Sequence, residues 1–166
     1  PSSSLMFAKF SPDGNKIAYV SENNLYSEDC TSGNIQALTT DGTVALINGT
    51  FDWAYEEEFA CRDGFRWSPD SKSIAYWQID ASDIKKFYMI NNTDAAYPFA
   101  VPVEYPIAGE KPSKVKIGVV DLMSKKTKWI IKTFPYSKFM KTYLTLRQMK
   151  TLMNILLTAM VQIIFT

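Results

Sequence analysis

The chain of 166 residues is long enough for one domain with a hydrophobic core, and its formal net charge is +1. A charge this close to zero, with no basic stripe interleaved with aromatic residues, excludes the electrostatic pattern of a nucleic-acid-binding protein. The sequence contains no histidine, so it supplies neither a Ser-His-Asp or Cys-His site nor a histidine zinc site. It also has no Gly-x-Ser-x-Gly, P-loop or Rossmann pattern, and we expect no cofactor and no metal.

A ten-residue pattern occurs twice, at an offset of 57 residues. Residues 10–19 read Phe-Ser-Pro-Asp-Gly-Asn-Lys-Ile-Ala-Tyr, and residues 67–76 read Trp-Ser-Pro-Asp-Ser-Lys-Ser-Ile-Ala-Tyr. Ser-Pro-Asp-Gly suits a type I turn, because Pro fixes φ at the second position and Gly fits the fourth. Each turn leads into a strand that is apolar on both faces, and such a strand must be covered on both faces. The repeat therefore predicts an all-β fold, a partial β-propeller of about two blades of antiparallel strands.

Other segments agree with antiparallel strands. Residues 24–27 and 34–38 predict two strands joined by a Thr-Ser-Gly turn, and residues 116–122 and 128–131 predict a hairpin. The segment from 80 to 112 is rich in proline, which excludes a helix or a central strand. We expect an extended, ordered excursion there.

The composition changes after about residue 133. Residues 138–166 contain no glycine and are rich in Leu, Met, Thr, Lys and Ile, spaced so that some could line one face of a helix. The apolar part is too short and too interrupted for a membrane span. We therefore divide the chain into a partial propeller at 1–132 and an atypical tail at 133–166, which we expect to come from a misread frame, an aberrant terminus or a diverged end. Because the chain does not begin with Met, we also expect it to be a piece of a longer protein.

Three glutamates stand in a row between the two repeats, at positions 56–58. Asp52 predicts the N-cap of a short helix whose first turns hold these glutamates, where the positive end of the helix dipole favours carboxylates. Neighbours on a helix are about 100° apart, so at most two of the three converge on one ligand. Two carboxylates suit a primary ammonium, which has three donors. A solvated acidic helix start is one alternative, and a calcium site is another, although calcium ligands usually alternate along a loop.

Residues 52–58, Asp-Trp-Ala-Tyr-Glu-Glu-Glu, resemble the Asp-Trp-x-Tyr-Glu-Glu-Glu motif of the dipeptidyl peptidase IV family, within the prolyl oligopeptidase clan of serine peptidases. The segments 67–76 and 103–109 also resemble that family, and the likeness covers roughly residues 5–130. The resemblance implies an N-terminal β-propeller that caps a C-terminal α/β-hydrolase domain. In the family this second domain carries the nucleophile, acid and histidine.

The resemblance further implies that Glu57 and Glu58 hold the free amino terminus of a peptide substrate. An anchor of this kind counts residues from the amino terminus, so the enzyme releases dipeptides, typically after Pro or Ala. The other motif residues, expected to support the pair, are Asp52, Trp53, Tyr55 and Glu56. Glu56 is the one expected to face away.

The expected partners follow from the same resemblance. They are a peptide with a free N-terminus, the missing α/β-hydrolase domain of the same chain and, for the full-length protein, a second copy in a homodimer, with no nucleic acid. The family favours a periplasmic, cell-envelope or secreted location. Without the hydrolase domain we expect no peptidase activity from the chain alone.

Two other readings stay open. One is a non-catalytic β-propeller that binds a peptide or protein partner, and a Gly-x-Ser-x-Gly downstream in the gene would decide against it. The other is a membrane-associated piece that acts through the tail. The sequence also does not decide whether Cys30 and Cys61 are bridged or free, because they form no CxxC pair.

Overall fold

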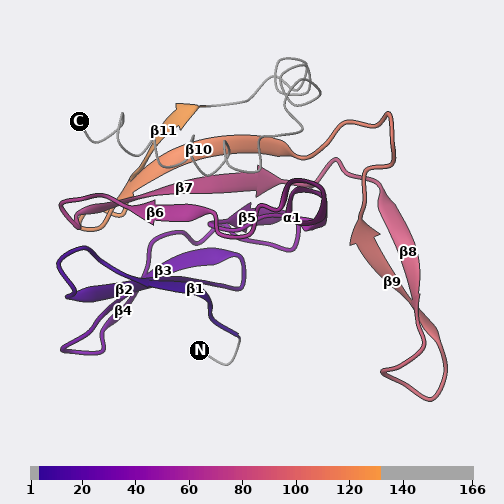
Figure 1. Ribbon diagram of the computed structural model, residues 1–166, viewed down its shortest axis with the longest axis horizontal. Coiled ribbons are helices and arrows are strands. Elements are labelled where there is room, and N and C mark those ends of the chain that lie inside the picture. The colour runs from indigo at the N-terminus through magenta and orange to yellow at the C-terminus, as the bar shows by residue number, and fades with distance from the viewer. Residues whose placement is uncertain (1–3, 132–166) are drawn as a thin grey trace.

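The structure is a computed structural model that describes residues 4–131. Figure 1 shows two antiparallel sheets stacked on one another, with a hairpin that projects from one end. The predicted tail at 133–166 and its predicted helix lie outside the described residues, so the boundary at 132 stays a prediction.

The first sheet is a four-stranded antiparallel meander in the order β1-β2-β3-β4. Its strands are β1 (Met6–Phe10), β2 (Lys16–Ser21), β3 (Asn24–Asp29) and β4 (Ile35–Ala37). The strands predicted at 24–27 and 34–38 are confirmed as β3 and β4. No separate pattern in the sequence predicted β1, because only its last residue belongs to the repeated pattern.

The second sheet is organised around β7 (Ser73–Asp80), which pairs along its whole length with β10 (Lys114–Asp121). On its other edge β7 pairs with two short strands placed end to end, β5 (Leu46–Asn48) and β6 (Phe65–Trp67). The outer strand is β11 (Thr127–Ile131), which forms the predicted hairpin with β10. Because β5 and β6 together occupy one strand position beside β7, this sheet, like the first, has the four strand positions of a propeller blade. The predicted partial β-propeller of about two blades is confirmed.

The repeated turns have the same hydrogen bonds in both blades. The serine hydroxyl donates to the aspartate two residues later, at 2.6 Å in both Ser11–Asp13 and Ser68–Asp70. This bond and a backbone N–H hold the pKa of each aspartate below its ordinary value. The turns therefore join β1 to β2 and β6 to β7 in the same way, which is the physical basis of the sequence repeat.

The fourth turn position distinguishes the two copies. Gly14 has φ +74°, and Ser71 in the second copy keeps a positive φ of 61°, which is costly for a residue with a side chain. The Ser71 hydroxyl accepts a hydrogen bond from the backbone N–H of Asp13 at 3.1 Å. The serine therefore connects the two blades at a position where glycine would only complete the turn.

Both faces of β7 are buried, as predicted for a strand with apolar residues on both faces. Ile74 and Tyr76 pack towards the first sheet, and Trp77 and Ile79 pack on the opposite side. The cluster between the blades also contains Ala18, Val20, Leu25, Leu38, Phe65, Trp67, Val120 and Leu122. The opposite cluster also contains Ile47, Phe51, Tyr55, Cys61, Val115 and Ile117.

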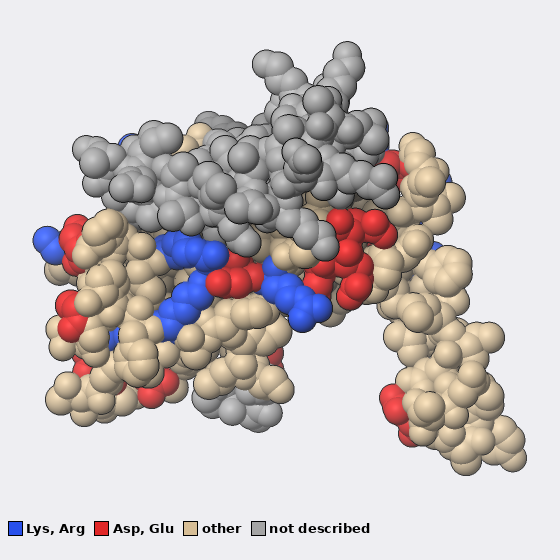
Figure 2. All heavy atoms as spheres, in the orientation of Figure 1, with Lys and Arg blue, Asp and Glu red and all other residues tan. Residues whose placement is uncertain are grey.

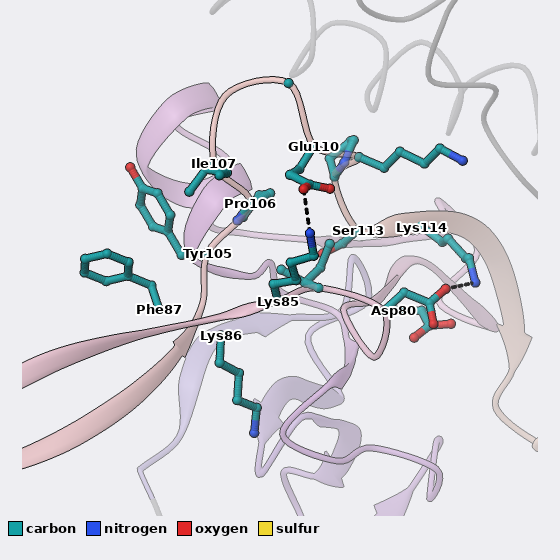
Figure 3. A pocket seen from close by; sticks show the side chains of 15 residues that line it. Asp80, Lys85, Lys86, Phe87, Tyr105, Pro106, Ile107, Glu110, Ser113 and Lys114 are labelled. Carbon is teal, nitrogen blue, oxygen red and sulfur yellow. Dashed lines mark hydrogen bonds and ion pairs between the residues drawn. The ribbon is translucent and has the colours of Figure 1, made fainter.

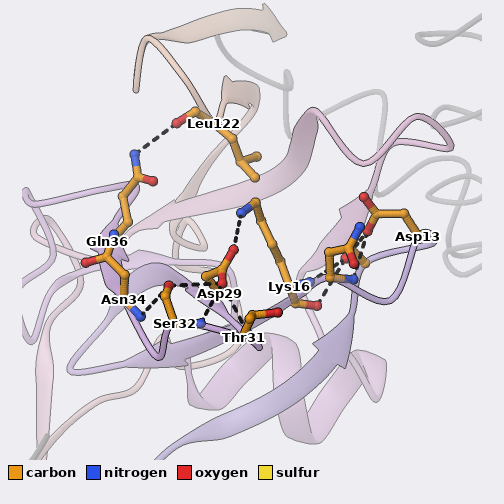
Figure 4. A network of polar contacts seen from close by, with 10 residues as sticks. Asp13, Lys16, Asp29, Thr31, Ser32, Asn34, Gln36 and Leu122 are labelled. Atoms are coloured by element: carbon orange, nitrogen blue, oxygen red, sulfur yellow. Dashed lines mark hydrogen bonds and ion pairs between the residues drawn. The ribbon is translucent and has the colours of Figure 1, made fainter.

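Polar contacts hold the outer part of the first blade, as Figure 4 shows. The Asp29 carboxylate accepts from the backbone N–H of Ser32 at 2.9 Å and pairs with Lys16 Nζ at 3.1 Å. Gln36 Nε2 on β4 donates to the backbone oxygen of Leu122 at 2.9 Å. The edge strand of one blade is thereby attached to the end of β10 in the other.

The extended, ordered excursion predicted at 80–112 is present, and part of it forms a regular hairpin that the sequence did not predict. The strands β8 (Lys86–Asn91) and β9 (Phe99–Glu104) form a regular antiparallel hairpin. Their pairing runs from Lys86↔Glu104 to Asn91↔Phe99. Each strand of an isolated ribbon has a free edge, where a proline such as Pro102 is tolerated.

Among the described residues, no helix is long and apolar enough to cross a membrane.

Two glycines with similar backbone angles provide a test of the blade packing. Gly49 has φ +79°, and a Cβ there would lie 2.8 Å from Val20 Cγ2; Gly33 has φ +68° with nothing within 4 Å. We expect Gly33→Ala to lower the free energy of unfolding by about 1 kcal/mol from the backbone alone. Gly49→Ala should lower the free energy of unfolding by about 2 to 4 kcal/mol, because the steric clash with Val20 adds to the same backbone strain. Urea unfolding followed by tryptophan fluorescence measures both, and equal losses would contradict the packing.

The two cysteines are free, with Cys30 exposed and Cys61 buried. Burial raises the pKa of the Cys61 thiol to about 11. At pH 8 we expect iodoacetamide to alkylate Cys61 at least about 100-fold more slowly than Cys30, since the thiolate is the reactive form. Mass spectrometry of the tryptic peptides measures both rates, and guanidinium should equalise them. Equal rates in the native chain would show that Cys61 is not in the core.

Candidate functional site

The acidic motif lies in an insertion, residues 49–64, between β5 and β6. Gly49 N–H donates to the backbone oxygen of Trp77 at 2.9 Å, and Trp77 N–H donates to the oxygen of Gly64, also at 2.9 Å. Gly64 N–H donates in turn to the oxygen of Gly49 at 3.0 Å. A Cβ at Gly64 would lie 2.8 Å from the carbonyl carbon of Gly49, so this close approach requires glycine. Both ends of the insertion are therefore attached to one residue of β7.

The insertion contains the helix α1 (Trp53–Phe59), and Asp52 is its N-cap, as predicted. Asp52 Oδ1 accepts from the backbone N–H of Tyr55 at 3.0 Å. A helix of seven residues is not stable by itself, so tertiary packing must hold it. The Tyr55 and Phe51 rings lie 6.2 Å apart in the buried cluster beside Trp77. These contacts place α1 directly against the second blade.

The three glutamates occupy different parts of α1. Glu56 is the only acid in the first turn and forms an ion pair with Arg62 Nε at 3.1 Å. Glu57 and Glu58 are exposed and lie nearer the C-terminal end, where the last turn has no basic residue. The prediction that the helix dipole favours these glutamates is confirmed for Glu56 and is wrong for the other two. Because α1 begins at Trp53 and is short, they lie towards the end that disfavours negative charge.

The basic residues near the motif are paired with acids other than Glu57. Asp63 forms ion pairs with Lys9 and with Arg66, the latter at 2.9 Å. Burial lowers the pKa of Lys9, and its Nζ also donates to the backbone oxygen of Phe65 at 2.8 Å. Figure 2 shows acidic atoms gathered over α1 and basic atoms directly beside them. Glu57 has no ion-pair partner among the described residues.

A segment distant in the sequence completes the surroundings of α1. Ser113 Oγ donates to Asp52 Oδ2, and the Tyr55 hydroxyl donates to the backbone oxygen of Ser113 at 3.3 Å. The Trp53 ring contacts the Tyr105 ring with centroids 4.6 Å apart. Asp52, Trp53 and Tyr55 therefore hold the helix in place. Sequence reasoning missed Tyr105 and Ser113, because no local pattern links residues more than 50 positions away to the motif.

A cleft of about 620 Å³ lies beside this segment, at the base of the β8–β9 hairpin (Figure 3). Ion pairs of Lys85 with Glu110 at 2.7 Å and of Lys114 with Asp83 at 2.5 Å line it. Tyr105 also lines the cleft, between the hairpin and α1. In the part of the chain that the structure describes, no group of three or more His, Cys, Asp or Glu side chains could hold a metal.

Comparisons with known proteins agree with this arrangement. Residues 1–148 match the profile of the dipeptidyl peptidase IV N-terminal region. The chain is 38% identical over 107 residues to dipeptidyl aminopeptidase B of Saccharomyces cerevisiae, covering 61% of this chain and 13% of that protein. It is 35% identical over 119 residues to the prolyl endopeptidase FAP of Mus musculus, covering 70% and 16%.

A solved structure shows the same similarity. The crystal structure of Porphyromonas gingivalis dipeptidyl peptidase 4 matches with a TM-score of 0.72 and 34% identity, over 76% of this chain and 18% of that one. The chain thus spans less than a fifth of the length of these relatives. The profile match runs past residue 133, where the atypical tail is predicted to begin. The motif, the two blades and these matches lead to one conclusion: the chain belongs to the dipeptidyl peptidase IV family and is part of its N-terminal region.

Proposed function

We propose that this chain is the part of a dipeptidyl peptidase propeller that anchors the substrate's free α-ammonium group, through Glu57 and Glu58. The observation that carries the proposal is the position of these two residues. They are exposed neighbours near the C-terminal end of a short helix, with no basic residue in its last turn. Two adjacent carboxylates at the negative end of a helix lower the stability of the fold. A cationic ligand between them offsets this repulsion, which gives the arrangement a functional reason.

An ammonium group matches such a pair chemically. It carries one positive charge and three N–H donors, so it can donate to both carboxylates at once. Each charge-assisted hydrogen bond contributes about 1.5 to 3 kcal/mol. A peptide without a free amine displaces water from the two carboxylates without supplying charged donors in its place, so the site would disfavour it by roughly 10²- to 10⁴-fold.

The anchor determines where the peptide is cut without taking part in the bond cleavage. Holding the amino terminus at a fixed point places the bond after the second residue at the reactive group, which is catalysis by positioning. The chain contains no histidine and therefore needs the α/β-hydrolase domain of the same protein for a Ser-His-Asp triad. The substrates we propose are peptides with a free N-terminus and Pro or Ala at the second position.

The fold supports the anchor with a rigid base. The insertion is attached to β7 at Trp77 through Gly49 and Gly64, and the helix itself packs on the second blade. Functional side chains commonly project from loops on a rigid scaffold. Glu56 forms an ion pair with Arg62, and we assign the ligand to its two neighbours, Glu57 and Glu58, because they are the exposed carboxylates of α1.

The direct test replaces each glutamate in the peptidase that carries this chain. We expect Glu57→Gln and Glu58→Gln to lower kcat/KM for Ala-Pro-p-nitroanilide by about 100-fold or more, since each removes a charged acceptor from the ammonium. The matched control is Glu56→Gln, which breaks a partly exposed ion pair worth about 0 to 1 kcal/mol and should leave kcat/KM within about threefold. None of the three substitutions should lower the melting temperature by more than a few degrees, and Glu57→Gln and Glu58→Gln should raise it slightly, because each removes one of two repelling charges near the negative end of α1. Wild-type turnover in both Glu57→Gln and Glu58→Gln would refute the anchor.

We further propose that the β8–β9 hairpin contacts a second copy of the full-length protein. The hairpin projects away from both blades (Figure 1). Its exposed apolar side chains include Tyr88 at 64% and Ile90 at 71% exposure. Each strand of the ribbon also has one edge that pairs with no other strand within residues 4–131. An exposed apolar surface of this kind is typical of a protein–protein contact.

Sedimentation of the full-length protein tests the homodimer. We expect a dimer that Ile90→Lys shifts to monomer, because a lysine in the contact would be desolvated. Val44→Lys, at an apolar residue of 78% exposure outside the hairpin, should leave the dimer intact. A wild-type monomer, or equal dissociation of both variants, would argue against a hairpin contact.

A further inference from the structure

The return segment, residues 105–113, runs from the end of β9 to the start of β10 and contacts the first turn of α1. Ser113 Oγ donates to Asp52 Oδ2, while Asp52 Oδ1 accepts from Tyr55 N–H at 3.0 Å. The Tyr55 hydroxyl donates to the backbone oxygen of Ser113 at 3.3 Å. The three contacts close a ring that begins and ends at Ser113. All three residues are buried, with Asp52 and Ser113 at 6% and 4% exposure.

Ser113 has a fixed position because of the strand that follows it. The strand β10 pairs with β7 from Lys114↔Asp80 to Asp121↔Ser73 without a break in register. A residue adjacent to such a ladder moves with the sheet. The helix α1, in contrast, belongs to a short insertion and depends on tertiary contacts. The hydrogen bond from the Ser113 hydroxyl to Asp52 therefore fixes the N-cap of α1 relative to the sheet.

The other end of the return segment makes an aromatic contact with the same helix. The Tyr105 ring lies 4.6 Å from the Trp53 ring and 5.7 Å from the Phe87 ring on β8, centroid to centroid. Between the two ends, Glu110 pairs with Lys85 at 2.7 Å. Figure 3 shows Tyr105, Glu110 and Ser113 along one side of the cleft. The segment is thus held at both ends and near its middle.

We propose that Ser113 is a positioning residue for the amine anchor. Through Asp52 it fixes the first turn of α1, and so the direction in which Glu57 and Glu58 are presented to the ligand. Tyr105 supports the same helix through Trp53. This inference rests on the proposed function of Glu57 and Glu58. Neither Ser113 nor Tyr105 needs to touch the substrate, since both act through residues of the motif.

The test compares three serine variants in the peptidase that carries this chain, with Ala-Pro-p-nitroanilide as substrate. We expect Ser113→Ala to lower kcat/KM about tenfold, mainly through KM, because a buried carboxylate loses its donor and the helix start shifts. Ser113→Thr keeps the hydroxyl and should stay within about threefold of wild type. Ser124→Ala is the control, since its hydroxyl donates to Asp121 at 2.7 Å beyond the far end of β10. It should leave kcat/KM unchanged.

A double-mutant cycle separates positioning from general stability. If Ser113 acts through the anchor, Ser113→Ala has little further effect on kcat/KM in a Glu57→Gln background. An equal loss in both backgrounds, or wild-type kinetics of Ser113→Ala, overturns the inference while the anchor stands. If Glu57→Gln and Glu58→Gln turn over like wild type, the proposed function itself fails, and this inference with it. If Ser113→Ala does not fold, the same comparison is made with Tyr105→Leu, which removes the ring that contacts Trp53, and Tyr105→Phe, which keeps it. Equal kcat/KM values for these two variants would count against the inference.

Discussion

The placement of the acidic helix depends on one residue of the central strand. Trp77 uses both of its backbone groups to bind the two ends of the insertion, accepting from Gly49 and donating to Gly64. Its side chain lies in the buried cluster that covers Phe51 and Tyr55. Because β7 is buried on both faces and paired on both edges, this attachment point has very little freedom. A helix too short to be stable alone is thereby given a defined position.

The two inserted segments of the second blade cooperate. One leaves between β5 and β6 and carries α1, and the other leaves between β7 and β10 and carries the β8–β9 hairpin. They meet at two places, where Ser113 binds Asp52 and where Tyr105 packs on Trp53. The acidic residues are therefore held by the blade on one side and by the second insertion on the other. This explains why the motif contains Asp52, Trp53 and Tyr55 together with its glutamates.

The sequence predicted the parts of this fold that repeat or that are local. The two Ser-Pro-Asp turns, the strands that follow them and the N-cap at Asp52 all depend on residues within a few positions of one another. The short strands β5 and β6 were missed because three residues are too few to show a period. The hairpin was not predicted because the proline-rich segment 80–112 has no clear strand pattern, and proline, which excludes a central strand, is tolerated in a two-stranded ribbon. The contacts of Ser113 and Tyr105 could not be predicted, since they join segments that only the folded sheet brings together.

We propose that the sheet holds Glu57 and Glu58 so that both carboxylates bind one ammonium group. The most direct measurement is the ¹³C chemical shift of the two side-chain carboxylates in this chain, titrated with alanyl-proline amide and with its N-acetylated form. On addition of the free amine, we expect the Glu57 and Glu58 signals to shift together with a single dissociation constant while the Glu56 signal stays constant. We expect no shift with the acetylated peptide. Equal shifts with both peptides, or a response of Glu56 in place of the pair, would contradict it.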